Sequence, residues 1–183
     1  MSVSNPEEKK RRLLSAASII VKEEGVSNLT LEAVAKKAGV SKGGLLYHYS
    51  SKEVLIKAMV QEWSSNYFKS IETFVKSETN SIGKWSNAYI NATLLDLNND
   101  KQLTSALMAA MYTNPSLLEE YKNEYGILLE KFMNDGIDPI KITIVRLAID
   151  GLWFSEIFDL APLDATLKHD VIHELNRMIK EEE

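Results

Sequence analysis

The chain has 183 residues, enough for one large or two small domains, and 45% of them are hydrophobic, which suffices for a substantial core. It contains no cysteine, which excludes a disulfide framework and a thiolate site, and this composition is compatible with a reducing cytoplasm. No apolar run approaches the ~20 residues of a membrane-spanning helix, and the N-terminus lacks the apolar segment of a secretory signal.

Charge is unevenly distributed along the chain, although the formal net charge is only −5. Residues 1–53 hold nine Lys/Arg and six Asp/Glu, a balance of +3, whereas residues 54–183 have a balance of −8. A basic segment followed by an acidic one is typical of a protein that binds nucleic acid through one end. The basic segment is therefore the expected nucleic-acid-binding part.

A first helix is predicted from Pro6 to about Glu24. Asn5 is a suitable N-cap, proline is favoured at the first helical position, and a glycine follows the segment. Four consecutive cations, residues 9–12, lie near the start of this helix. They are either a solvated helix face or, as a set, contacts to the phosphate backbone of DNA.

The segment TLEAVAKKAGVSKGGLLYHYSSKE, residues 30–53, has the pattern of two short helices joined by a tight turn. The first helix is expected over residues 31–38, because Thr30 is a good N-cap and Gly39 a good left-handed end. Ser41 is then expected to cap the second helix. Two helices joined by a three- or four-residue turn that contains glycine form a helix-turn-helix.

The second helix of this motif, expected over residues 42–49, begins with two adjacent glycines. Each of them costs a helix roughly 1 kcal/mol relative to alanine, and a surface helix gains little from that unless another molecule approaches its backbone closely. Polar and charged side chains surround this first turn: Lys42, Tyr47, His48 and Lys52. A helix N-terminus with such neighbours favours phosphate. The alternative is that the glycines only permit tight packing and that the other residues are solvated surface.

This segment resembles the DNA-binding signature of the TetR (tetracycline-repressor-like) family of transcriptional regulators. The matching parts are TLEAVA from Thr30, AGVSKG from Ala38 and LLYHYSSKE from Leu45. The resemblance covers the first quarter to third of the chain well, and the remainder only through length, helical pattern and order of elements. Two residues depart from the family pattern: Leu46 replaces a frequent aromatic residue, and Gly44 replaces a frequent Thr, Asn or Ala.

The resemblance implies a DNA-binding domain over residues 1–51 and a ligand-binding and dimerisation domain over residues 52–183. We expect the following residues to contact DNA: Thr30, Ser41, Lys42, Gly43, Gly44, Tyr47, His48 and Lys52. The cations, the tyrosine and the histidine would hold phosphates, and base reading would fall to Lys42 and the bare glycine backbone. A dimer would read a palindrome with half-sites about 34–36 Å apart.

The rest of the chain is predicted to be helical. A long helix begins near Lys52, where Ser50 and Glu53 have capping-box spacing, and continues to about Ser77. Further helices are expected over residues 82–98, 102–112, 114–134, 138–160 and 164–182. The predicted fold class is therefore all-α, with about nine helices in an N-terminal helix-turn-helix head and a helical body.

The helix of residues 138–160 is apolar nearly all round, so it must be covered on both sides. The last helix carries a second apolar stripe beside it. In the family, the last two helices pair with those of a second subunit as a four-helix bundle, and the resemblance implies a homodimer of this kind. The alternative is that both helices form the core of a monomer.

Aromatic and methionine side chains are frequent in the predicted body, where family members usually enclose a small-molecule inducer in an apolar cavity. The candidate ligand-binding residues are Trp63, Tyr67, Trp85, Tyr89, Met108, Met111, Tyr112, Asp150, Trp153 and Phe154. Taken singly, such residues are more often plain core than a ligand site. Asp150 and Glu156 interrupt the apolar helix, and the partner expected for each is a cation, Arg146 or solvent; in an aromatic cavity, either would suit a cationic or polar aromatic ligand.

No catalytic set is convincing in this sequence, so neither an enzymatic activity nor a cofactor is expected. His169 and His173 are four residues apart, as a metal pair would be, but solvated or interfacial histidines are the preferred interpretation. The expected function is a cytoplasmic repressor of transcription that a small-molecule inducer releases from a palindromic operator. The alternatives are a helical small-molecule carrier or enzyme with a vestigial head, and a DNA-binding factor without ligand control.

Overall fold

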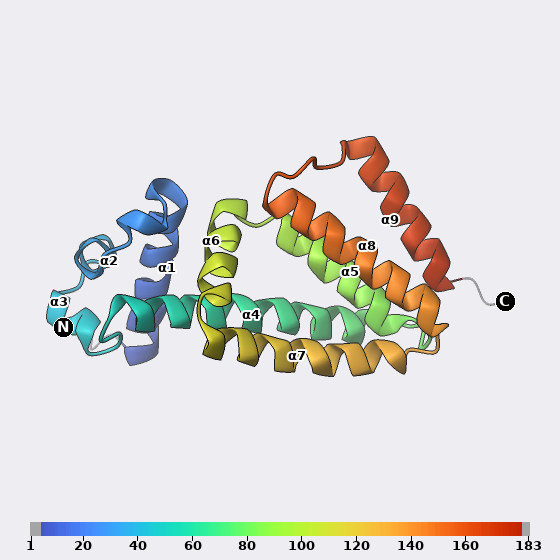
Figure 1. The fold of residues 1–183 in the computed structure, drawn as a ribbon. Helices are drawn as coiled ribbons and strands as arrows, with labels where there is room; N and C mark the ends of the chain where they lie inside the picture. The colour runs from blue at the N-terminus through green and yellow to red at the C-terminus, as the bar shows by residue number, and fades with distance from the viewer. Residues whose placement is uncertain (1–4, 181–183) are drawn as a thin grey trace. The chain divides into compact units, whose positions relative to one another are not determined.

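The computed structural model of the chain describes residues 5–180, and these residues form helices and no strand (Figure 1). The helices are α1 (Pro6–Glu24), α2 (Leu31–Ala38), α3 (Lys42–Leu46), α4 (Lys52–Ser77), α5 (Lys84–Leu97), α6 (Lys101–Tyr112), α7 (Pro115–Met133), α8 (Pro139–Ile157) and α9 (Ala165–Lys180). A short 3-10 helix, η1 (Val26–Asn28), joins α1 to α2. The prediction of an all-α fold with about nine helices is confirmed.

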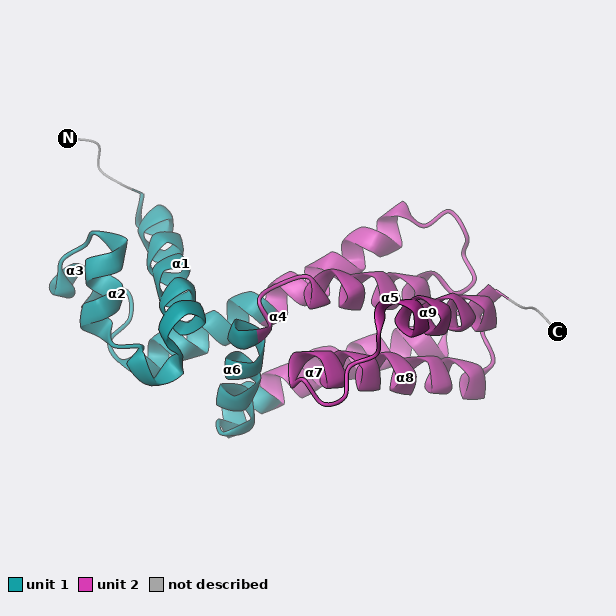
Figure 2. Ribbon diagram, turned by 90° about the horizontal axis from the view of Figure 1, so that it is seen from above, with its two compact units in different colours: residues 1–63, 102–118 teal, residues 64–101, 119–183 magenta. Residues whose placement is uncertain are grey.

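The helices form two compact units, each built from two separate parts of the sequence (Figure 2). Unit 1 comprises Met1–Trp63 and Gln102–Leu118, and unit 2 comprises Ser64–Lys101 and Glu119–Glu183. Helix α4 contributes residues to both units. The division into a DNA-binding domain of residues 1–51 and a ligand-binding domain of residues 52–183 stays a prediction. Residues 1–4 and 181–183 of these ranges lie outside the described residues.

In unit 1, short-range caps set the ends of the helices. Asn5 Oδ1 accepts a hydrogen bond from Glu7 N at 3.1 Å at the start of α1, and Thr30 Oγ1 accepts one from Ala33 N at 3.1 Å at the start of α2. Helix α2 ends at Gly39, whose φ of 65° is left-handed. Helix α1 packs against α2, and α2 against α3. The buried residues of these helices are Leu13, Ala16, Ala17, Ile20, Val21, Val34, Ala35, Ala38 and Leu45.

Two local predictions in this unit were wrong. The helix predicted over residues 42–49 ends at Leu46, and the chain then turns, with Tyr49 N donating to Leu45 O at 2.8 Å. The two glycines weaken this helix, and the chain must change direction before α4 begins. Ser51 rather than Ser50 caps α4, because Ser51 directly precedes the first helical residue and its Oγ accepts from Val54 N at 3.3 Å.

The core of unit 2 is built from buried side chains of α4, α5, α7, α8 and α9. Helix α5 packs against α8, and α9 packs against both. The buried core residues are Tyr67, Ile71, Ala88, Tyr89, Ile90, Ala92, Leu128, Phe132, Ile142, Val145, Ile149, Leu175 and Ile179. Asp135, between α7 and α8, is 3% exposed and accepts hydrogen bonds from Trp85 N at 3.1 Å and Ser86 N at 2.8 Å. It thereby satisfies the first N–H groups of α5, whose own N-cap, Gly83, has no side chain to do so.

Candidate nucleic-acid interface

The first turn of α3 exposes the backbone of two glycines. Ser41 Oγ accepts a hydrogen bond from Gly44 N at 3.1 Å, so Ser41 is the N-cap of α3, as predicted. A Cβ added at Gly43 would meet no heavy atom within 4 Å, whereas one added at Gly44 would lie 3.2 Å from Ser41 Oγ. Packing therefore does not require glycine at position 43, and the bare backbone leaves room for another molecule.

Lys42, the first residue of α3, forms an ion pair with Glu32 of α2. The side chains are 58% and 63% exposed, respectively. The hydrogen bond from Lys42 holds the pKa of Glu32 below its ordinary value. Exposed pairs of this kind contribute little to stability, so a phosphate can replace Glu32 as the partner of Lys42 at little cost.

Tyr47 is the most exposed aromatic residue of this region, with 84% of its surface accessible. Its ring packs edge-on against the His48 ring, with 5.0 Å between the centroids. Lys52 Nζ donates to Val26 O at 3.2 Å, which holds this cation beside η1. All eight residues predicted to contact DNA lie in unit 1, at the starts of α2, α3 and α4 and in the turn after α3.

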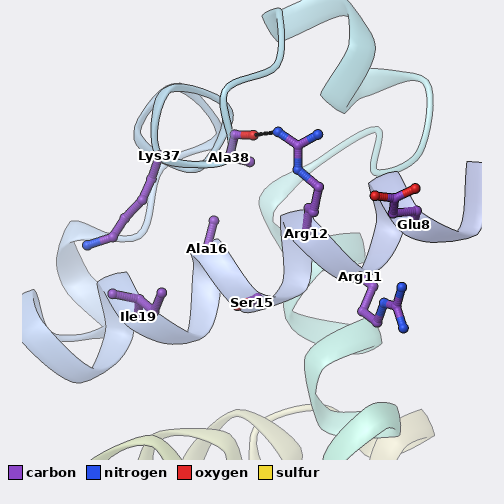
Figure 3. A pocket seen from close by; sticks show the side chains of 8 residues that line it. All are labelled: Glu8, Arg11, Arg12, Ser15, Ala16, Ile19, Lys37 and Ala38. Carbon is purple, nitrogen blue, oxygen red and sulfur yellow. Dashed lines mark hydrogen bonds between the residues drawn. The ribbon is translucent and has the colours of Figure 1, made fainter. Parts of the chain in front are cut away.

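The four cations near the start of α1 have different surroundings. Lys10 Nζ pairs with Glu7 Oε1 at 3.0 Å, whereas Arg12 Nη2 donates to Ala38 O at 2.6 Å. Figure 3 shows Arg12 extending toward Ala38 while Arg11 points away from it. Both arginines line a groove of about 460 Å³, whose lining residues are Glu8, Arg11, Arg12, Ser15, Ala16, Ile19, Lys37 and Ala38.

In unit 2, Asp150 is the centre of a polar cluster that also contains two tyrosines. Its carboxylate accepts hydrogen bonds from Tyr89 OH and, at 2.8 Å, from Tyr125 OH. Arg146 Nη1 lies 3.1 Å from Asp150 Oδ2. Burial raises the pKa of Tyr89 and of Tyr125, so both hydroxyls stay protonated and act as donors. Arg146, one of the partners expected from the sequence, thus pairs with Asp150.

Aromatic rings adjoin this polar cluster. The Tyr67 and Tyr89 ring centroids are 6.4 Å apart, and those of Tyr89 and Phe132 are 5.1 Å apart. Three predicted ligand-binding residues, Tyr67, Tyr89 and Asp150, therefore lie together. The sequence prediction missed Tyr125, and its spacing of four from Tyr121 on one helix was the signal that could have found it.

The other predicted ligand-binding residues of unit 2 take no part in the hydrogen bonds around Asp150. Trp85, at the start of α5, has Lys131 Nζ 5.5 Å from its ring centroid. Trp153 Nε1 donates to Asp96 Oδ2 at 2.7 Å, and Phe154 is 51% exposed. Their role in binding a ligand stays a prediction.

Four predicted ligand-binding residues belong to unit 1 rather than unit 2: Trp63, Met108, Met111 and Tyr112. The two methionines are buried in α6, and Trp63 is half-buried in α4. Tyr112 is 63% exposed at the end of α6. Burial of the methionines agrees with a core role, and ligand binding by any of the four remains untested.

Glu156, the second carboxylate of α8, is only 6% exposed and is held by two lysines. Lys101 Nζ lies 2.6 Å from Oε2, and Lys168 Nζ lies 2.8 Å from Oε1. Hydrogen bonds from these two lysines hold the pKa of Glu156 below its ordinary value. Of the alternatives expected from the sequence, Glu156 therefore has cations as its partners, and its charge is compensated within the protein.

Helix α8 and its C-cap residue, Phe158, carry a stripe of exposed apolar side chains, which we call the α8 stripe. Its members are Ile140, Ile144, Leu147, Phe154 and Phe158. Together with Gly151, they recur at alternating intervals of four and three residues, which places them on one side of the helix. A Cβ added at Gly151 would meet no heavy atom within 4 Å. The α8 stripe is therefore a candidate interaction surface.

Among residues 5–180, no three His, Asp or Glu side chains are arranged to hold a metal ion. His169 Nδ1 lies 3.2 Å from Asp170 Oδ1, and His173 is exposed. None of the helices in the described part of the chain combines the length and apolarity that a bilayer span requires.

Two family sequence profiles match the chain. The profile described as "Bacterial regulatory proteins, tetR family" matches residues 13–59, which include every residue predicted to contact DNA. The profile described as "Tetracyclin repressor-like, C-terminal domain" matches residues 83–180, more than half of the chain. The chain belongs to the TetR family. The resemblance recognised in the helix-turn-helix is confirmed, and it extends through the body.

Similar proteins agree with this assignment. The HTH-type transcriptional regulator SrpR of Pseudomonas putida is 32% identical to this TetR-family chain over 59 residues, which are 32% of the chain and 28% of SrpR. The match thus spans little more than a quarter of the length of that relative.

Solved structures match the TetR-family chain over nearly its whole length. The multidrug binding protein EbrR, solved with malachite green, has a TM-score of 0.65 and 19% identity, and the match covers 95% of this chain and 99% of EbrR. The fatty acid degradation regulator FadR from Bacillus halodurans has a TM-score of 0.69 and 18% identity, with coverage of 91% and 93%. At these identities the likeness shows the fold.

Proposed function

We propose that this TetR-family protein is a DNA-binding transcriptional repressor that a small-molecule inducer releases from a palindromic operator. The observation that carries the proposal is the first turn of α3, where an open glycine backbone lies between Lys42 and an 84% exposed Tyr47. Membership of a family of bacterial regulatory proteins supports it independently. A cytoplasmic location is part of the proposal, because such an operator is chromosomal DNA.

On DNA, α3 is expected to enter the major groove and the flanking residues to bind phosphates. Lys42 exchanges Glu32 for DNA and is the candidate for reading a guanine edge. Tyr47, His48 and Lys52 bind the phosphate backbone. The Gly43 backbone approaches base edges or thymine methyl groups, because it has no side chain to keep them at a distance.

The α8 stripe supports a homodimer through the last two helices, α8 and α9. Alternating spacings of four and three are those of helices that pack side by side along a seam, and Gly151 allows their backbones to approach closely. Helix α9 packs against α8 and adds Leu167, which is 50% exposed. In a two-fold dimer the same surface serves both subunits, so each copy covers the stripe of the other.

The Asp150 cluster is our candidate for the polar centre of an inducer site. Tyr67 and Tyr89 offer aromatic faces, and a carboxylate among aromatic rings suits a lipophilic cation. Malachite green, which EbrR binds, carries a positive charge. Such a ligand must compete with Arg146 for the carboxylate of Asp150. Glu156 is less suitable, because two lysines already compensate its charge.

Inducer binding in the body is expected to reach the DNA-binding head through α4, which contributes residues to both compact units. A coupling free energy of ~1–3 kcal/mol is the usual scale for such control. It corresponds to a loss of operator affinity between about fivefold and 150-fold when the inducer is bound.

Selection of bound sequences from a random DNA pool at fixed, near-physiological salt tests the DNA-binding proposal. Enrichment of one palindrome is the expected result, and its half-site spacing checks the dimer geometry. Binding without an enriched motif would indicate an architectural factor. No binding, with no ligand found by mass spectrometry of the denatured protein, would favour the carrier or enzyme alternative.

A thermal-shift screen tests the inducer proposal separately. Lipophilic cations should raise the melting temperature of the wild-type protein by mass action, and Asp150→Asn should reduce that shift. Fatty acids serve as the comparison ligands. A screen in which no cation stabilises the protein, or in which Asp150→Asn responds as the wild type does, would contradict the assignment of this site.

A further inference from the structure

The turn after α2 is fastened to α1 by one side chain. Gly39 takes a left-handed φ of 65°, and Val40 N donates back to Ala35 O at 3.0 Å. The carbonyl of Ala38, the last residue of α2, accepts a hydrogen bond from Arg12 Nη2 at 2.6 Å (Figure 3). This contact joins residues 26 positions apart in the sequence.

The position of the guanidinium suits it to hold this turn. It lies at the C-terminal end of α2, where the helix dipole favours a cation. A hydrogen bond from a charged donor is shorter and stronger than one between neutral groups. A Cβ added at Gly39 would lie 3.5 Å from Arg12 Nη2, so the guanidinium lies next to the position that a side chain at residue 39 would occupy.

The position of α3 depends strongly on this turn. A longer helix would be held in place by more contacts of its own. Helix α3 has five residues, two of them glycine, and Leu45 is its single buried residue. A helix so short and so rich in glycine has little stability of its own. Its N-cap, Ser41, is three residues beyond Ala38, so a shift of the Ala38 carbonyl is passed directly to the start of α3.

We infer that Arg12 is a positioning residue for operator binding, which fixes the turn that sets α3 and does not itself hold a phosphate. The inference rests on the proposed DNA-binding function. It separates Arg12 from Arg11, which has the same charge and lies next to it but points away from Ala38 (Figure 3). The sequence alone grouped both as candidate phosphate contacts.

Paired variants test the inference on DNA. Arg12→Gln and Arg11→Gln remove the same charge from adjacent positions of the full-length protein. Arg12→Gln should lower affinity for the selected operator about tenfold, with a smaller loss on scrambled DNA and a salt slope like that of the wild type. A phosphate contact would instead weaken both DNAs equally and lower the log–log salt slope by about 0.9. That result, or an unchanged operator affinity, would overturn the inference.

Amide hydrogen exchange without DNA supplies a readout that does not depend on the proposed function. Gly44 and Leu45 amides should exchange at least about fivefold faster in Arg12→Gln than in Arg11→Gln, because α3 is no longer held. Arg12→Lys keeps a hydrogen-bond donor and a charge, so it should restore part of this protection. It is compared with the wild type and Arg11→Gln if Arg12→Gln does not fold. Equal exchange in all variants would overturn the inference even if the wild type bound DNA. A wild type that enriched no DNA sequence would refute the proposed function alone.

Discussion

Replacing Leu147 by glutamate is a quantitative test of the α8 stripe as a dimer interface. The residue is 56% exposed. Since full burial of a leucine side chain contributes ~1.5–3 kcal/mol, covering the exposed part contributes about 1–1.5 kcal/mol. A two-fold interface contains the residue twice, so losing this burial costs the dimer about 2–3 kcal/mol, or roughly 30- to 150-fold in the dissociation constant. Desolvation of two carboxylates adds to that loss.

Sedimentation equilibrium over a series of protein concentrations measures the effect. Ile127→Glu is the matched control, because Ile127 is 59% exposed on α7 and does not belong to the α8 stripe. We expect Leu147→Glu to dissociate into monomers at concentrations where the wild type and Ile127→Glu remain dimeric. Circular dichroism establishes that each variant is folded.

The reasoning would be refuted if the two variants associated equally well. Equal dimerisation would mean that the α8 stripe is not at the subunit interface. A wild type that stayed monomeric at every concentration would refute the dimer itself. A Leu147→Glu protein that lost affinity for the palindrome but kept it for a single half-site would strengthen the proposal, because it separates pairing of the heads from contact with DNA.

Three further predictions concern the DNA-binding head and the buried carboxylate of α8. Lys52→Ala should weaken binding to all DNA sequences about equally and lower the salt slope by about 1; an unchanged slope would remove Lys52 from the phosphate contacts. Gly43→Val should abolish tight operator binding and leave thermal stability nearly unchanged, since its Cβ meets nothing in the protein; full operator affinity would contradict a close backbone approach. Glu156 has a lowered folded-state pKa, so its ion pairs stabilise the protein above the ordinary glutamate pKa of about 4.3 and are lost as pH falls through the lower folded value. The stability difference between wild type and Glu156→Gln should therefore shrink on acidification, and a pH-independent difference in melting temperature would count against this role.

The parts of the fold that local chemistry determines could be predicted from the sequence. Helices α1, α2 and α4 have the predicted bounds, because the residues that start or end them act within three positions. Asn5 and Thr30 bond to N–H groups two and three residues further on, and Gly39 adopts the left-handed conformation expected of it. The length of α3 was overestimated, since the pattern of apolar residues does not reveal where the chain must turn toward α4.

Contacts between distant residues could not be predicted in the same way. The acceptor for Arg12 is a backbone carbonyl, which has no signature in the sequence. A cation was one of the partners expected for Glu156, but the sequence did not identify Lys101 and Lys168, because they lie on other helices and only the packing of α8 against α9 brings one of them near. The α8 stripe was predicted only as an excess of apolar residues, because burial decides which of them remain exposed.

The capping of α5 by Asp135 constrains how this protein can be made. The first turn of α5 leaves the ribosome some fifty residues before the carboxylate that satisfies its N–H groups, at a sequence separation of 50 from Trp85. The two compact units also alternate along the sequence, because residues 102–118 of unit 1 lie between the two segments of unit 2. A nascent chain therefore cannot finish one unit before starting the other. Premature termination within α7 would leave α5 without its cap and expose the core of unit 2 to proteolysis, so unit 2 can be completed only after synthesis has passed Asp135.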